Sequence, residues 1–136
     1  MATPYVGEIR LFAGNFAPAG WFFCDGRVLA ISDYEVLYTL IGTTYGGNGS
    51  STFALPDLRS RVPIHQGQGP GLNNHVLGEP VGADSGTTTP ATGFTVERNL
   101  AATVTTTAAV VTGSGIQNRL GLGFIIAYAG IFPSQG

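Results

Sequence analysis

"GEIRLFAGNFAPAGWFFCDGRVL" (residues 7–29) holds the clearest strand pattern in the sequence. Residues 8–11 alternate charged and apolar side chains between two glycines, which predicts a half-buried strand. Residues 18–20 then turn the chain into the aromatic run at 21–24, and Asp25-Gly26 follows with the chemistry of a hairpin turn. The stretch therefore predicts a strand followed by an aromatic hairpin that forms the core.

The residues after this stretch predict one short helix, from about Asp33 to Ile41. Ser32 and Glu35 have the spacing of a capping box, in which each side chain bonds a free backbone N–H of the first turn. Gly42 stands where a C-cap residue with positive φ belongs. We expect the helix to pack on the Trp21 hairpin through one apolar stripe, made of Val36, Leu37, Leu40 and Ile41.

The glycine-rich run "YGGNGSSTFALPDLRSRVP" (residues 45–63) could suggest a phosphate-binding loop. Such a loop needs a lysine after its glycines and a helix start behind it, but the chain contains no lysine. Residues 52–55 instead predict a short extended segment that Pro56 ends. Glycine and asparagine tolerate positive φ, so we interpret residues 45–49 as a loop with special backbone geometry.

Composition limits the classes of function. The 136 residues are 43% hydrophobic and only 10% charged, with a formal net charge of −2. This length fits one domain, and the negative charge argues against nucleic acid and against an anionic lipid surface. The N-terminus has no pattern of a classical signal peptide, and the most apolar run, 122–132, is about half as long as a membrane helix, so we expect no membrane insertion.

The second half of the chain is less regular. Residues 66–71 and 78–92 predict surface loops, and residues 94–112, rich in β-branched side chains, predict one or two strands. Residues 124–128 have no polar alternation, so a strand there would need cover on both faces. In a domain of this size, we expect another chain to supply the second cover.

Three segments carry a family resemblance: residues 7–29, the "IS…LYTLIGTTYGGNG" segment at 31–49, and "TFALPDLRSRVPIHQGQGPG" at 52–71. Together they resemble the phage tail collar domain, which also occurs in bacterial proteins labelled microcystin-dependent. The terminal "FIIAYAGIFPS" (124–134) is similar to the closing strand of the same proteins.

The resemblance implies a mainly β fold with one short α-helix, an α+β class. It implies a compact tail-collar-type domain that is intertwined in a homo-oligomer, typically a homotrimer. We divide the chain into a tail collar domain at 1–72, a variable Gly/Thr-rich loop and strand region at 73–115, and the closing strand of the same domain at 116–136. Many relatives carry a His-x-His segment that helps to bind metal. Residues 96–111 contain no histidine, so we predict no metal site and no cofactor.

Candidate site residues lie mainly around the Pro-Asp turn. Arg59 and Arg61 alternate with a serine and would share a face of an extended segment. Their guanidinium groups suit structural ion pairs with a carboxylate such as Asp57, Asp25 or Glu8 of the same or a neighbouring subunit. Asp25 and Asp57 could be drawn as a glycosidase pair, but both occur in turn contexts. We therefore predict no catalytic residue. An oligomer interface is predicted at the end of the chain, at Phe124, Ile126, Tyr128, Ile131 and Phe132.

The cysteine and the two histidines are further candidates for chemistry. Cys24 is the only cysteine and follows an aromatic run, which favours a buried, unreactive thiol over a nucleophile. His65 is interpreted as a structural histidine, and His75 lies in a polar loop that predicts no role.

These observations leave three hypotheses about function. The leading one is a structural, non-enzymatic tail-fibre-like protein that forms a homo-oligomeric tip or adhesive module. The alternatives are a self-assembling extracellular filament subunit and, with less support, an enzyme acting on cell-surface glycans. The expected partners are other copies of the chain and a cell-surface receptor or glycan. The expected location is a virion tail or the outside of a cell.

Overall fold

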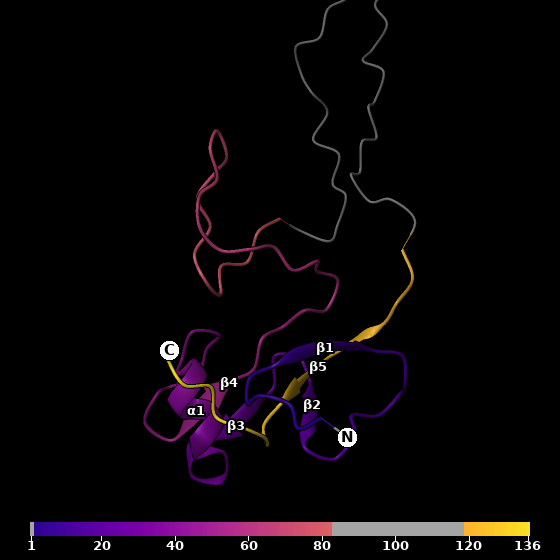
Figure 1. Cartoon of the computed structure of the whole chain (residues 1–136), viewed down its shortest axis with the longest axis vertical. Helices are drawn as coiled ribbons and strands as arrows, with labels where there is room; N and C mark the ends of the chain where they lie inside the picture. The colour runs from indigo at the N-terminus through magenta and orange to yellow at the C-terminus, as the bar shows by residue number, and fades with distance from the viewer. Residues whose placement is uncertain (1, 83–118) are drawn as a thin grey trace, which may run out of the picture. The chain divides into compact units, whose positions relative to one another are not determined.

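The computed structural model describes residues 2–82 and 119–136 (Figure 1). Nearly all of them belong to one compact unit, made of residues 1–81 and 121–136. This part of the chain is mainly β with one short α-helix, which confirms the predicted fold class. The strands predicted within 94–112 lie outside the described residues.

A three-stranded antiparallel sheet joins the beginning of the chain to its end. Its strands are β1 (Ile9–Phe12), β2 (Trp21–Phe23) and β5 (Gly123–Ala127), in the order β1-β5-β2. Ile126 of β5 stands opposite Ile9 on one side and Phe22 on the other. The C-terminal strand therefore lies in the centre of the sheet, and β1 and β2 do not pair with each other (Figure 1).

Both faces of β5 are covered within the same chain. Ile126 faces the core and is 1% exposed, while Ile125, on the opposite face, is 4% exposed. The same face of β5 carries two small residues, Gly123 and Ala127. Gly123 is paired with Phe12 of β1, and Ala127 is paired with Trp21 of β2. A Cβ at Gly123 would lie 2.6 Å from the ring of Phe23, so that ring lies directly over the glycine. The expectation that β5 needs another chain as its second cover is therefore wrong.

The charged side chain of β1 contributes to the same cover. Arg10 stands opposite Ile125, and its guanidinium lies 5.2 Å from the ring centre of Trp21. Glu8 accepts a 2.7 Å hydrogen bond from Arg10, which lowers the pKa of the Glu8 carboxyl. The predicted burial of Ile9 and Leu11 is wrong, because β1 is an edge strand and both side chains are exposed.

A second sheet consists of two antiparallel strands, β3 (Val28–Ala30) and β4 (Thr52–Ala54). The extended segment predicted before Pro56 is thus β4. The aromatic hairpin predicted around Asp25-Gly26 does not form, because β2 pairs with β5 and β3 pairs with β4. Asp25-Gly26 connects the two sheets instead.

The predicted helix is shorter than its pattern indicated. Residues 31–33 form a 3₁₀ turn, η1 (Ile31–Asp33), and α1 runs over Glu35–Ile41. Tyr34 is the N-cap and makes no side-chain capping bond, so the capping box predicted at Ser32 and Glu35 is wrong. The helix does end at Gly42, whose φ of 54° is positive and whose N–H donates to the Tyr38 carbonyl.

The face of α1 that contacts the core also differs from the predicted stripe. Leu37 is fully buried and Ile41 packs beside the core, but Val36 and Leu40 are exposed. Two tyrosines, Tyr34 and Tyr38, take the remaining core positions; the resulting spacing, at 34, 37, 38 and 41, is that of one helix face.

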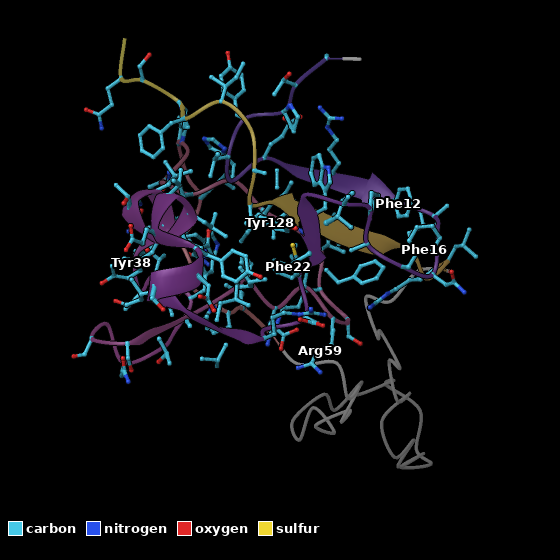
Figure 2. The ribbon with its side chains drawn as sticks, turned by 90° about the horizontal axis from the view of Figure 1, so that it is seen from below. Phe12, Phe16, Phe22, Tyr38, Arg59 and Tyr128 are labelled. Atoms are coloured by element: carbon cyan, nitrogen blue, oxygen red, sulfur yellow. The ribbon has the colours of Figure 1, made fainter. Side chains whose placement is uncertain are left out.

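Phe22, not Trp21, links the sheet to this helix. Its ring centre lies 5.2 Å from that of Tyr34. It lies 4.6 Å from the ring centre of Tyr128, and both Phe22 and Tyr128 are labelled in Figure 2. Trp21 lies on the other face of the sheet with Arg10, so the predicted Trp21–helix contact is wrong. The buried cluster beneath these rings consists of Val6, Cys24, Leu37, Phe53, Leu55 and Ile126.

The glycine-rich loop before β4 is organised by Asn48. Its Oδ1 accepts hydrogen bonds from the backbone N–H groups of residues 50, 51 and 52, at 2.9 to 3.0 Å. Gly47 has a φ of 93°, and a Cβ there would collide with the Phe53 backbone. The loop is thus a closely packed turn against β4, in agreement with its interpretation as special backbone geometry.

Within the described residues, no helix is both long and apolar enough to cross a membrane.

Two neighbouring residues of α1 test the core assignment. Leu37→Ala should lower the free energy of unfolding by about 2–5 kcal/mol, because it leaves a cavity in a fully buried site. Val36→Ala, at a half-exposed position, should change it by no more than about 0.5 kcal/mol. Urea unfolding followed by circular dichroism measures both, and equal losses would contradict the assigned helix face.

Candidate functional site

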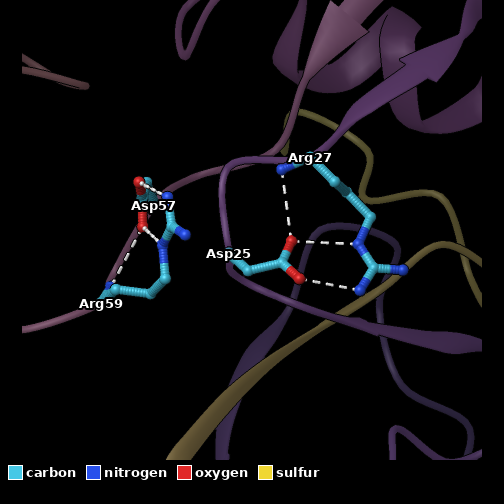
Figure 3. Close-up of polar contacts among 4 residues, drawn as sticks. All are labelled: Asp25, Arg27, Asp57 and Arg59. Carbon is cyan, nitrogen blue, oxygen red and sulfur yellow. Dashed lines mark hydrogen bonds and ion pairs between the residues drawn. The ribbon is translucent and has the colours of Figure 1, made fainter.

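Two aspartates form matching ion pairs with arginines two residues further on. Asp25 accepts hydrogen bonds from Nε and Nη2 of Arg27, at 3.0 and 2.8 Å, and Asp57 accepts from the same atoms of Arg59, both at 2.8 Å (Figure 3). Each Asp Oδ1 also accepts the backbone N–H of its own arginine, at 3.2 Å. We call these two units the Asp–Arg forks. The bidentate geometry is the strong form of this interaction.

The forks lie side by side because the ladder of β3 and β4 continues beyond the strands. Asp25 and Asp57 form an antiparallel bridge, in the same register as the pairing of Val28 with Ala54. The N–H of Leu58 donates to the Cys24 carbonyl at 2.9 Å and strengthens this extension. Two carboxylates directly opposite each other would repel, so their arginines remove a charge conflict that the register creates.

The arginines lower the pKa of both carboxyl groups. Hydrogen bonds from Arg59 lower the pKa of Asp57 to about 2, and those from Arg27 lower the pKa of Asp25. A glycosidase pair needs one carboxyl that stays protonated, which requires a raised pKa. Neither aspartate meets this requirement, so the geometry gives no support to the glycosidase hypothesis.

Cys24 lies beside the forks and is buried. Burial, with a smaller contribution from the Asp25 charge, raises the pKa of its thiol to about 12. A thiol in this state is a poor nucleophile, which agrees with the interpretation of Cys24 as a core residue. Among the residues that the structure describes, no three His, Cys, Asp or Glu side chains come close enough together to hold a metal ion.

The arginine after the second fork does not join it. Ser60 has a φ of 57°, so the segment is not extended and Arg61 does not share a face with Arg59 as predicted. Arg61 donates instead to the carbonyl oxygen of Val81 at 3.4 Å.

The two histidines lie away from the forks, in the segment that follows them. His65 is exposed. His75 forms a backbone bridge with Gly67, and its Nδ1 is 3.6 Å from a carboxylate oxygen of Glu79.

The residues predicted at an oligomer interface fall into two groups. Ile126 belongs to the core, and Phe124 and Tyr128 pack against it. Ile126 is 1% exposed and has almost no side-chain surface left for a partner, and the predicted interface stays a prediction. Ile131 and Phe132, in contrast, are 53% and 46% exposed.

Sequence reasoning missed Arg27 as the partner of Asp25. A signal was present, since Asp25-Gly26-Arg27 and Asp57-Leu58-Arg59 repeat the same Asp-x-Arg spacing. An aspartate in a turn commonly accepts the N–H two residues on, which places the side chain of that residue within reach. Only the strand register, however, brings the two units together.

Residues 7–63 match the family described as Phage Tail Collar Domain. The matched residues contain both forks, α1 and β1 to β4.

Two curated proteins are similar to the chain. The short tail fiber protein gp12 of Enterobacteria phage T4 is 39% identical over 70 residues, which cover 51% of this chain and 13% of that protein. Protein RhiB of Rhizobium leguminosarum bv. viciae is 40% identical over 48 residues, which cover 35% of this chain and 20% of RhiB. The chain thus matches only a small part of each relative.

The Asp57–Arg59 pair predicts an acid titration at unusually low pH. Because the folded-state pKa of Asp57 is below the ordinary value, the stability from this pair is present above about pH 4 and is lost as the pH falls through about 2. The contribution of this pair to the free energy of unfolding should be small, because the Asp57 side chain is 43% exposed. Carbon-13 NMR of the Asp57 carboxyl measures the midpoint directly.

The matched control is Arg59→Gln, which removes the guanidinium and should return the Asp57 midpoint to about 4. A wild-type midpoint already near that value would show that the fork does not persist in solution.

Proposed function

We propose that the chain is a structural, non-enzymatic protein of phage-tail-fibre type, acting as a homo-oligomeric tip or adhesive module. The observation that carries this proposal is the collar-domain match over residues 7–63, together with the 39% identity to a short tail fibre protein over 70 residues. A location in a virion tail or outside the cell follows from the same likeness. The expected partners are further copies of the chain and a cell-surface receptor.

The surface that fits self-association best lies where the two chain ends meet. Tyr5 and Ile131 form a parallel bridge, and the N–H of Val6 donates to the Ile131 carbonyl at 2.8 Å. Tyr5, Ile131 and Phe132 are all about half exposed. We call these three residues the terminal apolar patch. Backbone hydrogen bonds hold Tyr5 and Ile131 in place while the side chains of the patch remain in water, as expected for a surface that a partner covers.

The filament alternative has lost part of its basis. It rested on the lack of a heptad or shaft repeat in the sequence, on the low charge and on a last strand that lacked a second cover. Since β1 and β2 enclose β5 and their side chains cover it, the third argument no longer applies. The tail-fibre proposal does not depend on it, because the terminal apolar patch supplies a separate surface.

Assembly and its dependence on the patch can be measured together. Light scattering after size-exclusion chromatography should give the mass of a small oligomer for wild type at micromolar concentration. Ile131→Glu should shift that mass toward the monomer, because it places an unpaired charge in a covered apolar contact. Negative-stain microscopy of the wild type then separates discrete oligomers from long filaments.

The control is Val36→Glu, which adds the same charge at an apolar side chain of similar exposure on α1. It should leave the oligomer mass unchanged. A monomeric wild type would overturn the homo-oligomeric function, and equal dissociation of both variants would remove the terminal apolar patch as its interface.

A further inference from the structure

A hollow of about 380 Å³, open to solvent, lies beside the two Asp–Arg forks. Its volume is within the range of about 300–1,000 Å³ that is typical of small-molecule sites. The apolar part of its wall consists of large side chains from β2, β5 and the segments next to them. The lining residues are Gly14, Phe23, Cys24, Asp25, Leu58, Arg59, Leu122, Gly123 and Phe124.

The charged groups of this hollow are Asp25 and Arg59, one from each fork. Each is already paired, Asp25 with Arg27 and Arg59 with Asp57, so the rim carries no net charge. A free anion such as phosphate would have to compete with a bidentate carboxylate for the guanidinium. The rim therefore disfavours a small charged ligand.

Hydrogen-bonding capacity nevertheless remains on both groups. A guanidinium has five N–H donors, and Arg59 uses its Nε and one N–H of Nη2 on Asp57. A carboxylate can accept about four hydrogen bonds, and Asp25 accepts three, all from Arg27. The rim thus offers donors and an acceptor next to each other, above an apolar wall.

We propose that this hollow is a binding subsite for an uncharged saccharide unit. A sugar ring presents an apolar C–H face and hydroxyl groups that both donate and accept, which matches the apolar wall and the neutral rim. The inference rests on the adhesive part of the proposed function and assigns it a place in the fold.

The two forks differ in a way that makes a matched experiment possible. The guanidinium of Arg27 lies 5.2 Å from the ring centre of Phe22, and Arg27 does not line the hollow. Arg59 lines it and has a side chain that is 70% exposed. The two forks have the same bidentate geometry, so removing either guanidinium breaks an equivalent ion pair. Only Arg59, however, can contact a ligand in the hollow.

The test is a nitrogen-15 NMR titration of the full chain with D-glucose, D-galactose, N-acetyl-D-glucosamine and, for comparison, inorganic phosphate. At least one saccharide should shift the amide signals of Phe23, Leu58 and Gly123 at millimolar concentration. Arg59→Gln should weaken that binding by about tenfold, the loss of one charge-assisted hydrogen bond. Arg27→Gln should bind as wild type does.

A second variant, Leu122→Trp, tests the hollow without touching either fork. Leu122 is 47% exposed, so a larger ring can be accommodated and should block the saccharide.

The proposal is overturned if no saccharide shifts these signals, if phosphate shifts them more strongly, or if Leu122→Trp binds like wild type. Equal weakening by Arg59→Gln and Arg27→Gln would also overturn it, since the forks would then act only as turn supports. Light scattering on the same samples measures the oligomer mass independently of saccharide binding. A negative binding result would therefore leave the proposed oligomeric assembly to be tested on its own.

Discussion

The placement of β5 between β1 and β2 is the constraint on which the rest of the structure depends. Without it, β1 and β2 share no hydrogen bonds, because each pairs only with β5. The strand also contributes Ile126 to the core cluster. Small residues at Gly123 and Ala127 let the side chains of the flanking strands cover the second face. A pairing between residues so far apart in sequence must overcome the entropy of closing a long loop, and the buried apolar surface provides the compensation.

Three ion pairs in the described part of the chain are local. Glu8 with Arg10, and the two Asp–Arg forks, each join residues two positions apart. Such pairs add little stability at an exposed surface. They do neutralise charges at the edges of the strands, so the surface around them carries little net charge. Many apolar side chains are also exposed on the described part of the chain.

The candidate site was predictable in its parts but not in its arrangement. The turn roles of Asp25 and Asp57 follow from the residues around them, and Asp57 pairs with Arg59 within the same turn. Arg59 and Arg61 do not share the expected face, because Ser60 takes a positive φ that no local pattern indicated. The adjacency of the two forks, and the hollow beside them, require the register of β3 against β4 and the position of β5.

The sequence by itself determined the class of fold, the short helix ending at Gly42, the tight glycine-rich loop and the likeness to the collar domain, because these depend on local backbone preferences and on residues close in the chain. It did not determine which strands pair. The aromatic run at 21–23 has the local signals of a hairpin, yet it pairs with a strand about a hundred residues away. Nor did it determine the helix face, where Tyr34 and Tyr38 replace Val36 and Leu40. In both cases the choice depends on which apolar surface finds a partner across the fold, and burial outweighs local propensity.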